Sequence, residues 1–358
     1  MAYVTLSDPL LRLVAECGAV LLVTVVLLLL QILLLRARLI RRTAREQHFL
    51  EVWRPLMVAA TVGRADTIPP LDDSDKLYFL KLWNHLHESL RGEAKTRLNI
   101  LAASYGIAHY AQSLLRRKNL GLRLLALNTL GHLKDRTAWQ DILHLAQLPD
   151  PLLSFSAARA MFLIDADNAV NDLQQALLER EDWPPAQFAL LLQGNGTGKA
   201  YSVLVDTAIR LAGSTESDEL AQLDRLLQLL EVAPYQHVIS AIRTILSAGR
   251  NDQVIAHCLK FLREPDDLPS VRNLLDHPNW VVRLQAARAL GRIGTADDVL
   301  HLSALLSDSV WWVRYRTAQA LLALTRGNAQ SLAEVRTRLD DRYARDMLDM
   351  VMAEKEGR

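Results

Sequence analysis

The residues with the most obvious potential for chemistry form a glycine-rich stretch, Gly194 to Lys199, with the sequence GNGTGK. A phosphate-binding loop of the Walker type needs a glycine, four residues, Gly-Lys and then Ser or Thr. Gln193 stands where the first glycine should be, and Ala200 stands where the hydroxyl residue should follow. We therefore expect this stretch to be a turn between helices without a nucleotide.

The remaining candidate ligands and nucleophiles are poorly spaced. His85 and His87 would point to different faces of a helix, and His257 and Cys258 have no further ligand at a useful spacing. Residues 165–168 begin like a calcium loop, but alanine and valine occupy its fifth and sixth positions. No metalloprotease, serine hydrolase or β-lactamase motif is present. We expect no metal, no cofactor and no enzymatic activity.

The composition predicts an all-α protein. Leucine accounts for 71 of the 358 residues, whereas glycine and proline number only 15 and 12. Two cysteines exclude a disulfide framework and a multi-cysteine zinc site. The 41 basic and 40 acidic residues give a net charge of +1, which argues against a nucleic-acid partner.

An apolar segment near the start predicts one transmembrane helix over residues 10–35. Residues 17–35 are uncharged, and at 1.5 Å per residue they cover most of a hydrocarbon core of about 30 Å. A cleaved signal peptide would carry its basic residues before the apolar run and a small-residue site after it. A lipoprotein signal would not have Glu16 directly before Cys17. A buried core helix is usually shorter than this run.

The flanks of this segment predict its orientation. Five arginines follow it before any acidic residue: Arg36, Arg38, Arg41, Arg42 and Arg45. The positive-inside rule then places residues 1–9 outside and the body in the cytoplasm, as expected for a single-pass protein of the bacterial inner membrane. The same arginines could also bind anionic lipid, although setting the topology is the simpler interpretation.

The body contains internal repeats. Residues 280–294 (WVVRLQAARALGRIG) and 311–324 (WWVRYRTAQALLAL) align with Arg283 and Arg314 31 residues apart, and residues 122–133 and 154–163 form a weaker pair with the same spacing. The first of these resembles the short bacterial HEAT repeat named after phycobilisome lyases, with its pattern V-R-x-x-A-A-x-A-L-G-x-I-G. The resemblance implies an α-solenoid of helical pairs.

We divide the chain accordingly. A basic juxtamembrane segment (36–48) leads to a divergent helical cap (49–118), which precedes HEAT-like repeats (119–326) and C-terminal capping helices (327–358). Residues 165–275 keep helical periodicity but little of the motif. The number of repeats there stays open.

The resemblance also implies roles for individual residues. In such repeats the arginine pairs with an aspartate in the turn before it, which assigns Asp276 to Arg283 and Asp308 to Arg314 as a structural ladder. The helix that carries the arginine lines the concave side in related arrays. Trp280, Trp311, Trp312, Gln285, Arg288, Arg316 and Gln319 would then be partner-binding residues. Because Trp311 and Trp312 are adjacent, we expect them to point away from each other and at least one to be exposed. The alternative is that each tryptophan packs in the core.

These features predict a membrane-anchored HEAT-repeat scaffold or adaptor that presents a protein-binding surface in the cytoplasm. An accessory subunit of an inner-membrane complex, such as a polysaccharide synthase or a signalling complex, fits this topology. The alternative is a HEAT-like enzyme resembling the alkyl-DNA glycosylases or the bilin lyases. A small-molecule substrate is not expected.

Overall fold

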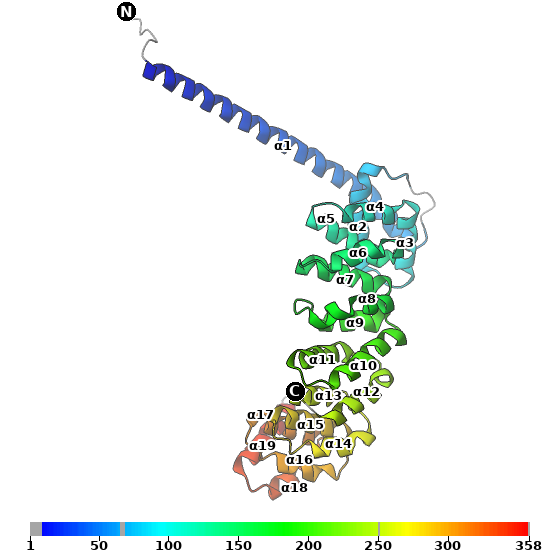
Figure 1. The fold of residues 1–358 in the computed structure, drawn as a ribbon, viewed down its shortest axis with the longest axis vertical. Coiled ribbons are helices and arrows are strands. Elements are labelled where there is room, and N and C mark those ends of the chain that lie inside the picture. Colours follow the sequence, from blue (N-terminus) through cyan, green and yellow to red (C-terminus); the bar gives the residue numbers. More distant parts are fainter. Residues whose placement is uncertain (1–8, 65–68, 250, 357–358) are drawn as a thin grey trace, which may run out of the picture. The chain divides into compact units, whose positions relative to one another are not determined.

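The computed structural model describes residues 9–64, 69–249 and 251–356, and every regular element in these ranges is a helix (Figure 1). The chain divides into two compact units, residues 1–117 and 118–358. The first unit contains α1 (Pro9–Thr61), α2 (Lys76–Ser89), α3 (Glu93–Ser104) and α4 (Ile107–Leu115). The second unit contains all the remaining helices.

Helix α1 combines two environments in one uninterrupted element. It is the one helix among the described residues that is long and apolar enough to cross a membrane; its mean hydropathy reaches 2.9, and none of that stretch is buried. One face of its C-terminal part is instead buried, through Phe49, Trp53 and Met57. The basic residues 36–48 lie within α1, between the apolar and the buried parts of the helix.

The core of the first unit is an aromatic cluster built around Trp53. Its indole stacks on Phe49 with ring centroids 5.4 Å apart, and it meets Phe79 of α2 edge-on at 5.5 Å. Tyr105, which follows α3, contacts Trp53 at 5.6 Å and donates a hydrogen bond from its hydroxyl to the Pro69 carbonyl at 2.7 Å. Such ring pairs add stability beyond the burial of their area. The apolar helix is thus an integral part of a folded core.

The second unit is a stack of helices in two layers (Figure 1). One layer consists of α5 (Leu120–Leu133), α7 (Pro151–Ile164), α9 (Pro185–Asn195), α11 (Ser217–Leu230), α13 (Asp252–Cys258), α15 (Trp280–Ile293), α17 (Trp311–Leu324) and α19 (Arg342–Glu356). Each of these packs against the next one in the list. The other helices are α6 (Trp139–Ala146), α8 (Ala166–Glu179), α10 (Gly198–Ala212), α12 (Tyr235–Ala248), α14 (Leu268–Asn273), α16 (Asp298–Leu305) and α18 (Ala329–Arg338). Of these, α6 to α16 lie against the first layer.

Small residues set the closest helix contacts. A Cβ atom on Gly291 of α15 would lie 2.7 Å from the Ala320 Cβ of α17. A Cβ on Gly131 of α5 would lie 3.1 Å from the Ala160 Cα of α7. The offset is 29 residues in both pairs, so α5–α7 and α15–α17 stack in the same register. These glycines are needed because a side chain there would push the helices apart.

The expected pairing of Asp276 with Arg283 and of Asp308 with Arg314 was wrong, because Arg283 pairs with Asp308 instead. Arg283 donates to the carboxylate of Asp308, 25 residues later, with Nε 2.6 Å from Oδ2 and Nη2 3.0 Å from Oδ1. Asp276, the expected partner, is exposed. Arg314 donates from Nη1 to the Asp308 backbone carbonyl at 2.7 Å and forms no ion pair with a described residue. Each arginine therefore holds the carbonyls of its own turn, and Arg283 also reaches the aspartate of the next turn.

A second set of ion pairs, which the sequence reasoning missed, joins the turns of the other layer. Arg243 of α12 donates to Asp267 at 2.7 Å, and Arg272 of α14 grips Asp298 through two bonds of 2.6 and 3.0 Å. Both aspartates are buried. Three further guanidinium groups donate to backbone carbonyls nearer the N-terminus: Arg180 to Leu148 at 2.8 Å, Arg225 to Leu177 at 2.6 Å and Arg292 to Leu259 at 2.8 Å.

Candidate functional site

Three exposed tryptophans mark one end of α15 and α17. Trp280 is the first residue of α15, and Trp311 and Trp312 open α17. Their exposed fractions are 41%, 42% and 52%. By contrast, Trp53, Trp83 and Trp183 are buried in the two cores. The core alternative for the three tryptophans is thus wrong, because none of the three residues is buried.

The rings of α17 form one cluster. Trp311 and Trp312 meet nearly at right angles with centroids 4.7 Å apart, so the expectation that they point away from each other was wrong. Trp311 also stacks on Tyr315, one helical turn later, with centroids 5.1 Å apart. Residues of a first helical turn have no preceding turn beside them, which leaves room for both indoles on one side. The cluster offers a rigid apolar surface to solvent.

Two arginine–glutamine pairs follow the tryptophans along the helices. On α15, Arg288 donates from Nη1 to Gln285 Oε1 at 3.4 Å. On α17, Arg316 donates to Gln319 Oε1 at 2.8 Å and lies 5.7 Å from the Tyr315 ring. Gln285 is equivalent to Arg316, and Arg288 to Gln319, at the 31-residue repeat. The two helices thus carry the same pair in opposite order.

We call these seven residues the tryptophan–arginine face: Trp280, Gln285, Arg288, Trp311, Trp312, Arg316 and Gln319. All are exposed or half-buried, as a binding surface requires. The ladder arginines Arg283 and Arg314 are bonded within turns instead, and they belong to the architecture.

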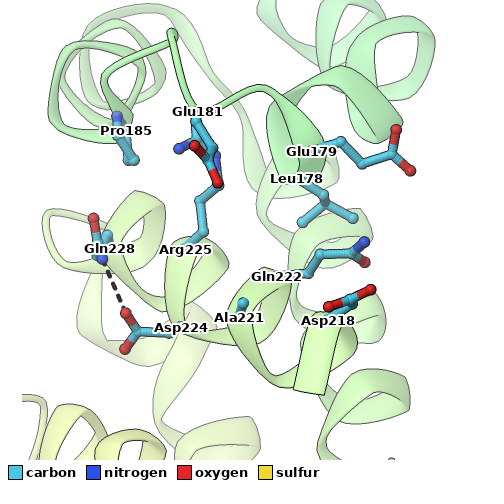
Figure 2. A pocket seen from close by; sticks show the side chains of 10 residues that line it. All are labelled: Leu178, Glu179, Glu181, Pro185, Asp218, Ala221, Gln222, Asp224, Arg225 and Gln228. Atoms are coloured by element: carbon cyan, nitrogen blue, oxygen red, sulfur yellow. Dashed lines mark hydrogen bonds between the residues drawn. The ribbon is translucent and has the colours of Figure 1, made fainter. Parts of the chain in front are cut away.

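A second surface feature is an acidic hollow of about 520 Å³ between the α8–α9 turn and α11 (Figure 2). Four carboxylates line it: Glu179, Glu181, Asp218 and Asp224. The guanidinium of Arg225 also lines it, but Arg225 donates to the backbone carbonyls of Leu177 and Trp183. Sequence reasoning missed this hollow. The only sign of the hollow in the sequence is the clustering of acidic residues in 179–182 and 216–224, two segments that lie two helices apart.

The glycine-rich stretch is the turn between α9 and α10. Asp167 of α8 accepts hydrogen bonds from the Thr197 amide at 3.0 Å, the Thr197 hydroxyl at 2.6 Å and the Ala200 amide at 3.2 Å. These are the amides that a phosphate would need, and a carboxylate already occupies them. Burial would raise the pKa of Asp167, but these hydrogen bonds outweigh it and hold the pKa below its usual value.

The histidine–cysteine pair has a structural environment. The ring nitrogens of His257 lie 2.8 Å from an oxygen of Asp224 and 2.8 Å from an oxygen of Glu231, which ties α13 to α11. Burial raises the pKa of the Cys258 thiol to about 12, so it stays protonated and unreactive. Within the described ranges, no group of three histidine, cysteine or acidic side chains is arranged to hold a metal ion.

The arginines that follow the apolar segment lie on α1. Arg36, Arg38 and Arg41 are exposed, and the side chain of Arg42 lies outside the described residues. Arg45 is already bonded, because its Nε donates to Asp75 at 2.9 Å and its Nη2 to Ser74 at 2.6 Å. Only the first three therefore present a free basic surface in the described part of the helix.

Comparison with known proteins supports the repeat assignment. A family model described as HEAT repeats matches residues 223–322, which include α15 and most of α17. No curated protein matches the chain. Residues 223–322 are therefore similar to HEAT repeats, and they lie within an all-α stack of helices.

Three crystal structures of engineered proteins also match. The first is 17% identical, covers 79% of this chain and 86% of its own, and has a TM-score of 0.35. The second and third are 19% and 18% identical, cover 72% and 70% of this chain and 94% and 99% of their own, and have TM-scores of 0.24 and 0.21. At these TM-scores the likeness carries no inference about function.

Proposed function

We propose that this HEAT-repeat protein is a membrane-anchored scaffold that binds a partner protein through the tryptophan–arginine face. The observation that supports this most directly is the exposure of Trp280, Trp311 and Trp312 on adjacent repeats. Large aromatic side chains are usually largely buried, so exposed ones point to a binding surface. Tryptophan and arginine are among the residues that most often anchor interfaces. Repeat arrays build such surfaces by presenting the same helix of each unit side by side.

In this proposal, the apolar part of α1 spans the bacterial inner membrane once. The exposed Arg36, Arg38 and Arg41 hold the repeat array in the cytoplasm by the positive-inside rule. The partner is a subunit of a membrane-associated complex such as a polysaccharide synthase, because the anchor keeps the array at the membrane. The scaffold has no reaction of its own in this proposal, and it acts by binding.

A crosslinking pulldown from native membranes with the full-length chain tests the proposal. Trp311→Ala and Trp312→Ala should each weaken recovery of the partner, because truncating an interface anchor costs about 2 kcal/mol or more. That corresponds to roughly a thirtyfold loss of affinity. Tyr343→Ala on α19 is the matched control, since Tyr343 is an exposed aromatic outside the face.

Thermal unfolding of each variant separates binding from folding. Full recovery of the partner by both tryptophan variants would show that the partner docks elsewhere. Loss of binding only in variants that also unfold would argue that the tryptophans are structural.

A further inference from the structure

Arg288 and Arg316 of the tryptophan–arginine face differ in their partners from the arginines of the array that form ion pairs. Arg243, Arg272 and Arg283 each bind a carboxylate. Arg288 and Arg316 bind only the side-chain oxygen of a glutamine, and no described carboxylate forms an ion pair with either. A glutamine oxygen orients a guanidinium through one N–H group and leaves its charge uncompensated. Two oriented positive charges therefore face solvent on neighbouring helices.

Further positive charge lies beside Arg288. Partial burial lowers the pKa of Arg292, and the nearby charges of Arg288 and Arg263 lower it further. Arg292 donates to the Leu259 and Leu262 carbonyls, while Arg263 is exposed and lies 6.0 Å from the Tyr235 ring. The charges on this side of α15 thus repel one another, and an anionic partner would relieve that repulsion.

The acidic side chain that reaches this region from α19 is bonded to a tyrosine and forms no ion pair with Arg288 or Arg316 among the described residues. Glu354 accepts a hydrogen bond from the Tyr315 hydroxyl at 3.0 Å. The bond holds Tyr315 in place beneath Trp311, so it supports the aromatic cluster. The surface that remains consists of apolar rings at the start of the helices and guanidinium groups about one to two turns further along.

We propose that the tryptophan–arginine face binds an acidic peptide segment of the partner, with an aromatic or proline side chain against Trp311 and Trp312 and carboxylates on Arg288 and Arg316. This rests on the proposed scaffold function and names the chemistry of its partner. Carboxylates match guanidinium groups in charge and in geometry, because the planar fork can donate two parallel hydrogen bonds. Aromatic and proline side chains pack against exposed indole rings.

A nucleic acid would also supply anions and stacking rings. The observations favour a peptide, because the chain carries nearly as many acidic as basic residues and an acidic hollow lies in the same unit. Nucleic-acid binding requires many phosphate contacts along a basic tract, and acids in the same unit would oppose them.

Fluorescence titration of the full chain in lipid nanodiscs tests the inference with four short synthetic peptides that differ only at selected positions. They combine acidic or amide side chains with aromatic or glycine residues. The acidic, aromatic peptide should bind most tightly, and its affinity should fall as salt rises. Equal binding of its amide counterpart would overturn the charge assignment, and equal binding of its glycine counterpart would overturn the aromatic one. Tighter binding of a DNA or RNA oligonucleotide would show that the face reads phosphates.

Charge reversal identifies the binding residues. The double substitution Arg288→Glu and Arg316→Glu should weaken the acidic, aromatic peptide by about tenfold or more, because two attractive contacts become repulsive. The matched control is Arg210→Glu with Arg338→Glu, two exposed residues on α10 and α18 that change the net charge equally. The inference fails if both double variants lose affinity alike.

The two proposals can fail separately. A native partner that is released by Trp311→Ala or Trp312→Ala, combined with peptides that do not bind, would leave the scaffold function standing and overturn its acidic partner. A partner that is retained by both tryptophan variants would show that it docks elsewhere, and it would overturn the tryptophan–arginine face as the binding surface of the scaffold.

Discussion

Arg283 and Asp308 form a two-bonded ion pair across the boundary between two repeats, with Nε 2.6 Å from Oδ2 and Nη2 3.0 Å from Oδ1. Their side chains are only 15% and 5% exposed. The Asp308 carboxylate also accepts a hydrogen bond from the Val310 amide at 2.8 Å. One carboxylate thus shapes its own turn and fastens the preceding repeat.

Removing Arg283 should destabilise the array. Breaking one side of a buried ion pair costs about 3–5 kcal/mol, whereas an exposed pair is worth about 1 kcal/mol or less. We expect Arg283→Ala to lower the free energy of unfolding, measured in urea, by an amount between these two values. Asp308→Asn should also destabilise, and Asp276→Asn should not, because Asp276 is exposed and forms no ion pair with Arg283. Equal losses for the two aspartate variants would contradict the register described above.

Gly291 should resist substitution even though it lies inside a helix. Alanine is favoured over glycine in a helix by up to about 1 kcal/mol. At Gly291, however, the new Cβ would lie 2.7 Å from Ala320 Cβ, and overpacking costs about 1–3 kcal/mol. Gly194→Ala on α9 is the control, because nothing lies within 4 Å of its Cβ position. Differential scanning calorimetry should show a lower Tm for Gly291→Ala and an equal or higher Tm for Gly194→Ala.

The turn aspartates predict acid sensitivity. Burial alone would raise the pKa of Asp298 and Asp308, but hydrogen bonds from Arg272 and Arg283 outweigh it and hold both below the usual 3.8. A lowered folded pKa gives stability that is present above the unfolded pKa and lost as pH falls through the folded pKa. The free energy of unfolding should therefore be level from about pH 7 to pH 5 and fall below about pH 4. Asp298→Asn should be less stable at neutral pH with a shallower acid slope; an unchanged slope would argue against this role.

The aromatic cluster of the first unit should depend on α1. Truncating a buried tryptophan costs about 3–5 kcal/mol, so Trp53→Ala should strongly destabilise the first unit. The neighbouring Val52 is exposed on the same helix, and Val52→Ala should change stability by at most about 0.5 kcal/mol. Proteolysis of residues 65–117 in the membrane-bound chain provides the measurement. Similar protection in both variants would show that α1 is not part of that core.

The orientation of the chain can be read with reporters. A reporter that functions only in the cytoplasm should be active when fused after Arg358, because Arg36, Arg38 and Arg41 follow the apolar segment. A reporter that functions only outside the cytoplasm should be silent at the same position. The reverse pattern would overturn the proposed topology.

The all-helical repeats were predictable from sequence because the motif around Arg283 has an unmistakable pattern of alanines, leucine and glycine. The partner of Arg283 was not predictable from the sequence. Asp276 and Asp308 both lie in turns, and which of them pairs with Arg283 depends on how the repeats stack. The repeat at residues 154–163 lacks the motif arginine. Ser154 takes the place of the arginine and accepts a hydrogen bond from Trp183 at 3.2 Å, while Arg180 binds the carbonyl of Leu148.

The tryptophan–arginine face was only partly predictable. Adjacent positions on a helix lie about 100° apart, which led us to separate Trp311 and Trp312. Their side chains lean together because Tyr315 offers a ring to both, at 5.1 and 6.2 Å. The acidic hollow was not predictable, since its carboxylates come together only when α11 packs against α8 and α9.

The continuity of α1 has a mechanical consequence. Its apolar stretch and the buried Phe49, Trp53 and Met57 share one helical frame, so their azimuths around the helix axis are locked to each other. Any rotation of the apolar stretch about its axis would therefore rotate the first unit by the same angle. One added residue before Phe49 would shift the phase by about 100°, and seven would nearly restore it.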